Sequence, residues 1–408
     1  MEIRALLKAL WRSRTGPLLI AVQIAISLAV LVNIAYMVVS RIEIYRQPTG
    51  IDLNNIFWVT SQGFGTKYDQ ATTVRSDLAY LNGLPGVIAA AATMSLPQRT
   101  WGNNLPFSAV PGTKGPRIIC RYVLMTDRGL DALGLHLAAG RAPHADATTA
   151  PPDLMSAAER WAPEVAITKL LANRLFPKGD ALGKTLYTGG IDKAAKIVGI
   201  VEYMQWTPAG GPGARFNESV VFVPGMPAGP EATYLVRTQP GRRAEVMAQV
   251  EHSLAVRAPA RFISHMETMD ETAANTRSRL KSSSIILGAV GFLVLAVTAL
   301  GIFGLAAFNV TTRRRQIGTR RAIGARRRDI LRYFLLENWF ISTAGVLVGC
   351  TLALALGAEL SVMFEVPRLP LYYLAFGVAA LWLVGFGATL YPARRAASVA
   401  PAIATRAV

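Results

Sequence analysis

The chain has 408 residues, of which 52% are apolar and 17% are charged, and its mean hydropathy is +0.33. A soluble globular domain carries about 25% charged residues, so this composition favours a membrane protein. The net charge of +18 does not require a nucleic-acid partner, because the basic excess lies mainly beside apolar segments. Residues 41–281 hold 26 basic and 20 acidic residues, and the rest holds 17 and 5. We expect this excess to face anionic membrane lipid.

Four stretches without Asp, Glu, Lys or Arg predict transmembrane helices, because about 20 helical residues cross the roughly 30 Å hydrocarbon core. These stretches cover residues 15–40, 282–312, 339–358 and 369–393. We place the four helices at residues 16–40, 283–310, 338–358 and 370–392. The first apolar run is about twice as long as the apolar part of a typical signal peptide, so we expect it to be retained.

The charges beside the predicted helices indicate their orientation, because Lys and Arg near the ends of a span stay on the cytoplasmic side. The loop at residues 311–337 carries nine arginines against Asp329 and Glu337. We therefore expect three cytoplasmic segments and two periplasmic ones. The cytoplasmic segments are an amphipathic N-terminal segment at 1–15, the loop at 311–337 and the C-terminus at 393–408. The periplasmic segments are a large domain at 41–282 and a short turn at 359–369.

Residues 41–282 mix helix and strand signals without a regular alternation, which predicts an α+β fold, in two lobes, inserted between transmembrane helices 1 and 2. We expect helices at residues 71–82 and 165–176. We expect strands at residues 195–201, 219–223 and 233–237. The Pro- and Gly-rich residues 140–152 and 207–213 predict loops. Cys120 and Cys350 fall in different parts of the chain and cannot pair, so this fold needs no internal disulfide.

No catalytic, cofactor-binding or metal site emerges from the sequence. Residues 179–185 resemble a phosphate-binding loop, but they have three residues between the glycines instead of four, so we expect a turn that leads into a strand. The four histidines have no ligand spacing, and His144 beside Asp146 favours a solvated loop over a metal site. These features disfavour an external enzyme.

The predicted helices also lack charged residues near the middle of the membrane, which disfavours an ion-coupled carrier or a pore. Their polar residues predict hydrogen bonds between helices. These residues are Gln23, Ser27, Asn33 and Thr298. Glycines in the second and third helices favour close helix packing. They are Gly301, Gly304, Gly345 and Gly349.

The arginine-rich loop has apolar residues at spacings near those of one helical face. They are Ile317, Ile323, Ile330, Leu331 and Phe334. One interpretation is a solvated loop beside the lipid. The other is a short amphipathic helix along the membrane whose apolar face docks in the groove of a partner.

At this loop the sequence R-x-x-x-I-G-x-R-x-A-I-G-A-x-x-x-D-I-L, from Arg313 to Leu331, resembles the FtsX-like permease domain of ABC transporters. The resemblance continues to the terminal Y-P-A-R-R-A-A at residues 391–397. Upstream, L-P-G-V at residues 84–87 and I-V-G-I-V at residues 197–201 resemble the periplasmic core domain of MacB-like permeases. The family is the mechanotransmission class, also called type VII, and its permeases span the bacterial inner membrane.

The resemblance implies that the loop is the coupling helix on which an ATPase acts. Its residues are Arg313, Ile317, Gly318, Arg320, Ala322, Ile323, Gly324, Ala325, Asp329, Ile330 and Leu331. It also implies a dimer with a second copy or a paralogous permease. Unlike MacB, the chain shows no fused ATPase, so we expect a separate cytoplasmic ABC ATPase dimer that binds ATP and Mg²⁺. A periplasmic adaptor and an outer-membrane channel are further partners implied by export members of the family.

The function that the resemblance implies is export of a peptide, drug or other substrate from the periplasm. A lipoprotein-release permease and an FtsX-like regulator of periplasmic cell-wall hydrolases are alternatives within the family. A sensor with an external ligand domain is an alternative from another class. The substrate is unknown. Four external aromatic residues are candidate contacts for it, although core packing is the commoner role. They are Trp101, Trp161, Trp206 and Phe216.

Overall fold

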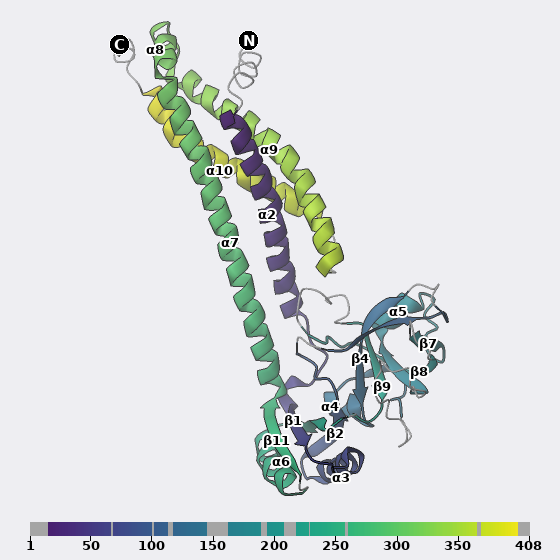
Figure 1. Cartoon of the computed structure of the whole chain (residues 1–408). Coiled ribbons are helices and arrows are strands. Elements are labelled where there is room, and N and C mark those ends of the chain that lie inside the picture. The colour runs from purple at the N-terminus through teal and green to yellow at the C-terminus, as the bar shows by residue number, and fades with distance from the viewer. Residues whose placement is uncertain are drawn as a thin grey trace. The chain divides into compact units, whose positions relative to one another are not determined.

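The computed structural model describes residues 15–66, 68–99, 102–112, 117–144, 162–188, 194–207, 218–227, 229–257, 260–364 and 369–398. The chain divides into two compact units (Figure 1). The membrane unit consists of residues 1–42 and 282–408, and the external unit consists of residues 43–281. Helices α2 and α7 each contribute residues to both units.

The helices of the membrane unit come from both ends of the chain. They are α2 (Thr15–Arg46), α7 (Met269–Thr312), α8 (Arg314–Ala322), α9 (Arg327–Phe364) and α10 (Leu371–Ala397). Among the described residues, α2, α7, α9 and α10 are long and apolar enough to cross a membrane. Each predicted span coincides largely with one of them, but α7 and α9 begin well before the charge-free stretches. Charged residues such as Glu, Lys and Arg are good helix formers, so a charge does not end a helix.

Helix α2 packs closely against α9 because α9 presents glycines to it. A Cβ atom on Gly345 would lie 2.6 Å from the Ala21 carbonyl oxygen, and one on Gly349 would lie 3.0 Å from the Ala25 Cα. Both distances are shorter than a normal contact, so only glycine allows this approach. Gly304, in contrast, has no atom within 4 Å of its Cβ position and makes no such contact.

The polar residues of the spans hydrogen-bond between helices. Ser27 of α2 and Thr298 of α7 join their hydroxyl groups at 2.6 Å. Gln23 Nε2 donates to the Val297 carbonyl oxygen at 3.0 Å, and Asn33 Nδ2 donates to the Ala353 carbonyl oxygen at 3.1 Å. Polar side chains in the membrane are stabilised by such partners, and these contacts account for them without an ion pathway.

The external unit is α+β. Its helices are η1 (Leu53–Asn55), α3 (Gln70–Gly83), α4 (Gly129–Leu133), α5 (Lys169–Leu175) and α6 (Arg243–Arg257). Its strands are β1 (Ile56–Gly63), β2 (Val87–Thr93), β3 (Asn104–Ser108), β4 (Ile118–Met125), β5 (Leu137–Gly140), β6 (Glu164–Thr168), β7 (Thr185–Thr188), β8 (Ala194–Val201), β9 (Val220–Pro224), β10 (Glu231–Thr238) and β11 (Arg261–Thr268).

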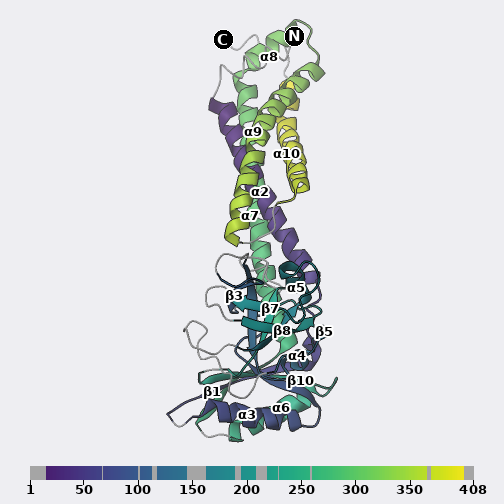
Figure 2. The ribbon, with the colours of Figure 1, turned by 90° about the vertical axis from the view of Figure 1, so that its right-hand side faces the viewer.

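Within the described residues the strands join one sheet in the order β11-β1-β10-β2-β4-β3-β7-β8-β6-β9, with β5 paired to β8. All pairings are antiparallel except β4 with β9 and β6 with β8. Helices α3 and α6 lie against the part formed by β1, β10 and β2 (Figure 2), where Val74, Tyr234 and Val250 are fully buried. A separate apolar cluster lies between α5 and the strands β3, β4 and β6 to β9.

The predicted elements of this unit match the structure except at one place. The helix expected at 71–82 is α3, and the three expected strands are β8, β9 and β10. Residues 165–168, expected as the start of a helix, instead belong to β6, which pairs with β8 and β9. Val165, Ile167 and Thr168 are β-branched and buried, so tertiary pairing overrides the helical spacing. The expected loops at 140–152 and 207–213 lie largely outside the described residues.

Residues 177–184, which include most of the phosphate-loop-like sequence, form a turn before β7, as expected. Gly179 and Gly183 have φ angles of +78° and +81°, which favour glycine. Lys184 Nζ lies 3.4 Å from Asp180 Oδ2, an ion pair within the turn itself. The glycines therefore serve the backbone of the turn.

Candidate functional site

The arginine-rich loop forms two helices joined by a tight turn. Helix α8 ends at Ala322 and α9 begins at Arg327, so the coupling helix expected in the loop at 311–337 is interrupted at residues 323–326. Gly324 has a φ of +104°, a conformation that other residues rarely adopt. Asp329 then caps α9, because its Oδ2 accepts from the Arg326 N–H at 2.9 Å.

Most of the apolar residues predicted to dock in a partner pack inside this chain. Ile317, Ile330 and Phe334 are only 4–5% exposed. They form a cluster with Val310 and with Ala393, Ala396 and Ala397 at the end of α10. Leu331, Ala325 and Tyr333 pack against the same cluster. This apolar face therefore fixes α8 and α9 to α10 and is not free to bind a second protein.

Ile323 differs from these residues because its side chain is 81% exposed. It lies in the turn beside Gly324, which is also exposed. The charged residues that follow are exposed as well. They are Arg326, Arg327, Arg328, Asp329 and Arg332. The side chain of Arg320 lies outside what the structure describes. The turn thus presents one large apolar side chain, that of Ile323, within a basic surface.

A buried ion pair joins the junction of α7 and α8 to α9. Arg313 lies between α7 and α8, and its Nη1 is 3.0 Å from Glu337 Oε1 and 3.2 Å from Oε2. The Glu337 side chain is only 4% exposed. The same Nη1 is 3.4 Å from the Tyr333 hydroxyl. No local pattern predicts this pair, because the two residues are 24 positions apart and meet only when the chain reverses at the turn.

The comparison with protein families covers this region. Residues 288–401 match the family described as FtsX-like permease C-terminal. The chain is also 28% identical over 354 residues to "Macrolide export ATP-binding/permease protein MacB" of Marinobacter nauticus, which covers 83% of this chain and 49% of the relative. The chain therefore carries an FtsX-like permease domain and is similar to the MacB ABC permeases. The α8–α9 turn lies inside the part of the permease that matches the family.

The chain is also similar to a second exporter and to one solved structure. The permease is 39% identical over 137 residues to "Pyoverdine export ATP-binding/permease protein PvdT" of Pseudomonas putida, covering 33% of this chain and 21% of the relative. The solved periplasmic region of MacB from Actinobacillus actinomycetemcomitans is 14% identical, covers 58% of this chain and has a TM-score of 0.34. The permease spans less than half the length of these curated relatives.

The remaining candidate residues form no second site among the described residues. Trp206 is fully buried in the core of the external unit, which agrees with a packing role. Trp101, Trp161 and Phe216 lie outside the described residues. His144 Nδ1 is 2.9 Å from Asp127 Oδ2, and no group of three potential metal ligands occurs in the part of the chain that the structure describes.

Proposed function

We propose that the chain is the permease subunit of an ABC transporter and that an ATPase acts on its α8–α9 turn. The exposed side chain of Ile323 is the observation that carries this proposal. Its apolar neighbours in the loop are buried against α10, so Ile323 remains as the large apolar residue that a partner groove would cover. The surrounding arginines suit a partner with acidic residues at the rim of that groove.

The proposed orientation follows from charge. The α8–α9 turn and both ends of the chain lie on the cytoplasmic side of a bacterial inner membrane, because that is where arginine-rich segments remain. Residues 41–282 then form a periplasmic domain between the first two spans. Labelling of a Val256→Cys variant with a membrane-impermeant maleimide, in cells whose outer membrane is permeabilised, tests this orientation.

The proposed mechanism is transmission of movement. ATP-driven closure of the ATPase moves the α8–α9 turn, and the buried residues of the loop carry α10 and α9 with it. The Arg313–Glu337 pair holds the end of α7 to α9 at the same place. Because α7 continues into the external unit, its movement changes the periplasmic domain, and a substrate handled there need not cross the bilayer.

We assign the ATP-binding step to a cytoplasmic ABC ATPase dimer outside residues 1–408, because these residues contain no phosphate-binding loop with the spacing that ATP requires. The permease works as a pair, with itself or with a paralogue. The names of the relatives favour export, since they refer to macrolide and pyoverdine export. A periplasmic adaptor and an outer-membrane channel complete the proposed path.

The test is co-purification of an ABC ATPase with the tagged permease from native membranes. Replacing Ile323 by Asp should remove the ATPase or weaken its binding about 10-fold or more, because burying one Ile contributes about 1.5–3 kcal/mol. The matched control is Val256→Asp, since Val256 is an aliphatic residue of the external unit that is 73% exposed. Loss of the ATPase only in the Ile323→Asp variant supports the proposal. Equal recovery from both variants, or no ATPase with the unaltered chain, refutes it.

A further inference from the structure

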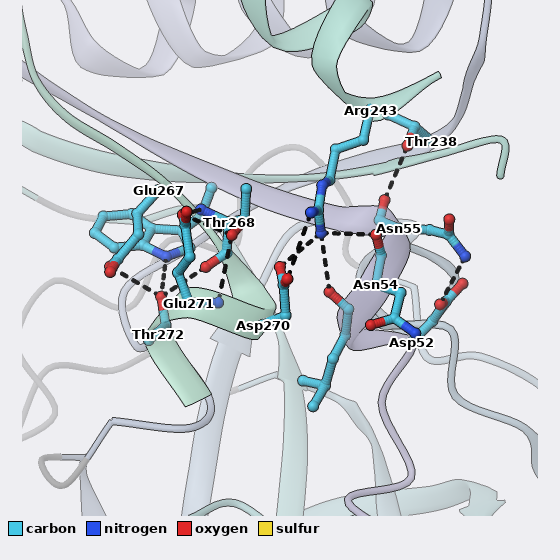
Figure 3. Close-up of polar contacts among 12 residues, drawn as sticks. Asp52, Asn54, Asn55, Thr238, Arg243, Glu267, Thr268, Asp270, Glu271 and Thr272 are labelled. Carbon is cyan, nitrogen blue, oxygen red and sulfur yellow. Dashed lines mark hydrogen bonds and ion pairs between the residues drawn. The ribbon is translucent and has the colours of Figure 1, made fainter. Parts of the chain in front are cut away.

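Helix α7 begins without any linker after the external sheet. Strand β11 ends at Thr268 and α7 starts at Met269. The Thr268 hydroxyl accepts from the Glu271 N–H at 3.3 Å, while Glu271 Oε2 accepts from the Thr268 N–H at 3.2 Å and from its hydroxyl at 2.7 Å (Figure 3). This reciprocal arrangement is a capping box, which fixes the path of the chain into the helix.

The next residues of α7 are tied to the strands on either side. The Thr272 hydroxyl accepts from Trp58 Nε1 of β1 at 2.8 Å and lies 3.0 Å from Glu267 Oε2 of β11. The other Glu267 oxygen accepts from Asn275 Nδ2 at 2.8 Å. Trp58 is 1% exposed and belongs to the core of the external unit. The first two turns of α7 therefore cannot rotate without breaking contacts to that core.

An ion pair connects the same turn of α7 to a second helix. Arg243 is the first residue of α6, and its Nη1 lies 2.6 Å from Asp270 Oδ1. That nitrogen also donates to the Asn54 carbonyl oxygen at 2.7 Å and lies 3.5 Å from the Leu53 carbonyl oxygen (Figure 3). One guanidinium group thus joins α7, α6 and η1. It differs from the adjacent Arg242, whose ion pair with Glu245 stays within the start of α6.

Helix η1 is itself fixed to the sheet. Asp52 Oδ2 accepts from Arg237 Nε of β10 at 2.9 Å, and Asp52 Oδ1 accepts from Asn55 Nδ2 at 2.9 Å. The Thr238 hydroxyl donates to the Asn55 carbonyl oxygen at 3.0 Å. A displacement that reaches Arg243 is therefore passed to β10 as well as to α6.

We propose that Thr268, Asp270, Glu271 and Thr272, together with Arg243, form an α7 anchor through which movement of α7 reaches the external sheet and α6. This inference rests on the proposed function, in which α7 moves. Without the anchor, α7 is joined to the unit by the backbone of β11, the buried Met269 and two hydrogen bonds, from Asn275 to Glu267 and from Thr276 to the Gln98 carbonyl oxygen. The helix then turns about that junction, and α6 stays in place. Arg243 and Thr272 are positioning residues in this scheme.

The test is hydrogen–deuterium exchange of the permease–ATPase complex in lipid nanodiscs, with and without ATP and vanadate. Peptides from the α8–α9 turn report the input, and peptides from α6 report the output. In the unaltered complex both should change their exchange with nucleotide. In Arg243→Ala the turn should still respond and the response of α6 should be lost. Arg242→Ala, which removes the neighbouring ion pair but no contact with α7, should behave like the unaltered complex.

The outcomes separate the two proposals. No nucleotide response in the turn of the unaltered complex refutes the proposed function, and the anchor with it. A response of α6 in Arg243→Ala equal to that of the unaltered complex refutes the anchor alone. If Arg243 has only a structural role, Arg243→Ala raises the exchange of α6 both with and without nucleotide. The change in α6 exchange caused by nucleotide then stays the same, and this result also refutes the anchor. If Arg243→Ala does not fold, Asp270→Asn weakens the same link between α7 and α6 at nearly constant volume, and the same outcomes apply.

Discussion

Replacing Arg313 by Gln should destabilise the membrane unit strongly, because Glu337 would remain buried without its counter-charge. Both Glu337 oxygens lie within 3.2 Å of Arg313 Nη1, and the Glu337 side chain is 4% exposed. Removing one partner of a buried ion pair costs about 3–5 kcal/mol. Glu337→Gln should cost less, because Arg313 is 19% exposed and its long side chain can turn toward water.

The double variant distinguishes this charge effect from a packing effect. Arg313→Gln combined with Glu337→Gln leaves no buried charge, so it should recover most of the loss and differ from the unaltered chain by about 1–2 kcal/mol. The assay is equilibrium unfolding of the full chain in mixed detergent micelles, followed by tryptophan fluorescence. The coupling energy of the double-mutant cycle is the quantity of interest. A loss below about 1 kcal/mol in Arg313→Gln, or a double variant that is no better than this single variant, would refute the reasoning.

Three further predictions concern single positions. Asp77→Ala should lower the free energy of unfolding of the full chain by about 3–5 kcal/mol, because it leaves the fully buried Arg261 without its carboxylate. Chemical denaturation measures this loss, and an effect as small as that of a surface substitution would contradict the prediction. Tyr234→Phe removes only the 2.6 Å bond from its hydroxyl to the same carboxylate and should cost about 1–2 kcal/mol by the same measurement. Burial raises the pKa of the Cys120 thiol to about 12, so at pH 8 a maleimide should label this thiol only after the chain unfolds. Mass spectrometry measures the labelling, and rapid labelling of the native chain would contradict the prediction.

The sequence predicted the membrane unit well because its signals are long and local. Charge-free stretches of 20 or more residues leave few alternatives to membrane helices, and the described helices coincide with them. Helices α7 and α9 extend beyond the charge-free stretches, because a charge can mark the end of a membrane span without ending the helix. The start of α7 has a local signal in the sequence, because Thr268-x-x-Glu271 is the pattern of a capping box at a helix N-terminus.

The candidate site was predicted only in part, because the sequence does not show which residues pack against distant segments. One apolar pattern in the loop includes Ile317, Ile323 and Ile330. Of these, Ile317 and Ile330 are buried, whereas Ile323 is exposed. The difference arises at Gly324, whose positive φ ends the helical pattern and places Ile323 in the turn. The partners of the buried pair come from α10, more than 60 residues further along the chain. Such contacts depend on the tertiary fold and have no local signature.

The glycine contacts of α9 have a consequence for the lipid around the protein. In their most apolar windows, 44% of the α2 residues and 39% of the α9 residues are buried, but only 17% of those in α7. When α2 and α9 shift relative to each other they lose close dispersion contacts. Helix α7 has few such contacts within this chain to lose and, in the proposed membrane orientation, moves mainly against acyl chains. The rate at which α7 slides should therefore follow the viscosity of the bilayer. Stiffer, more ordered lipid would slow the chain without altering a single hydrogen bond inside it.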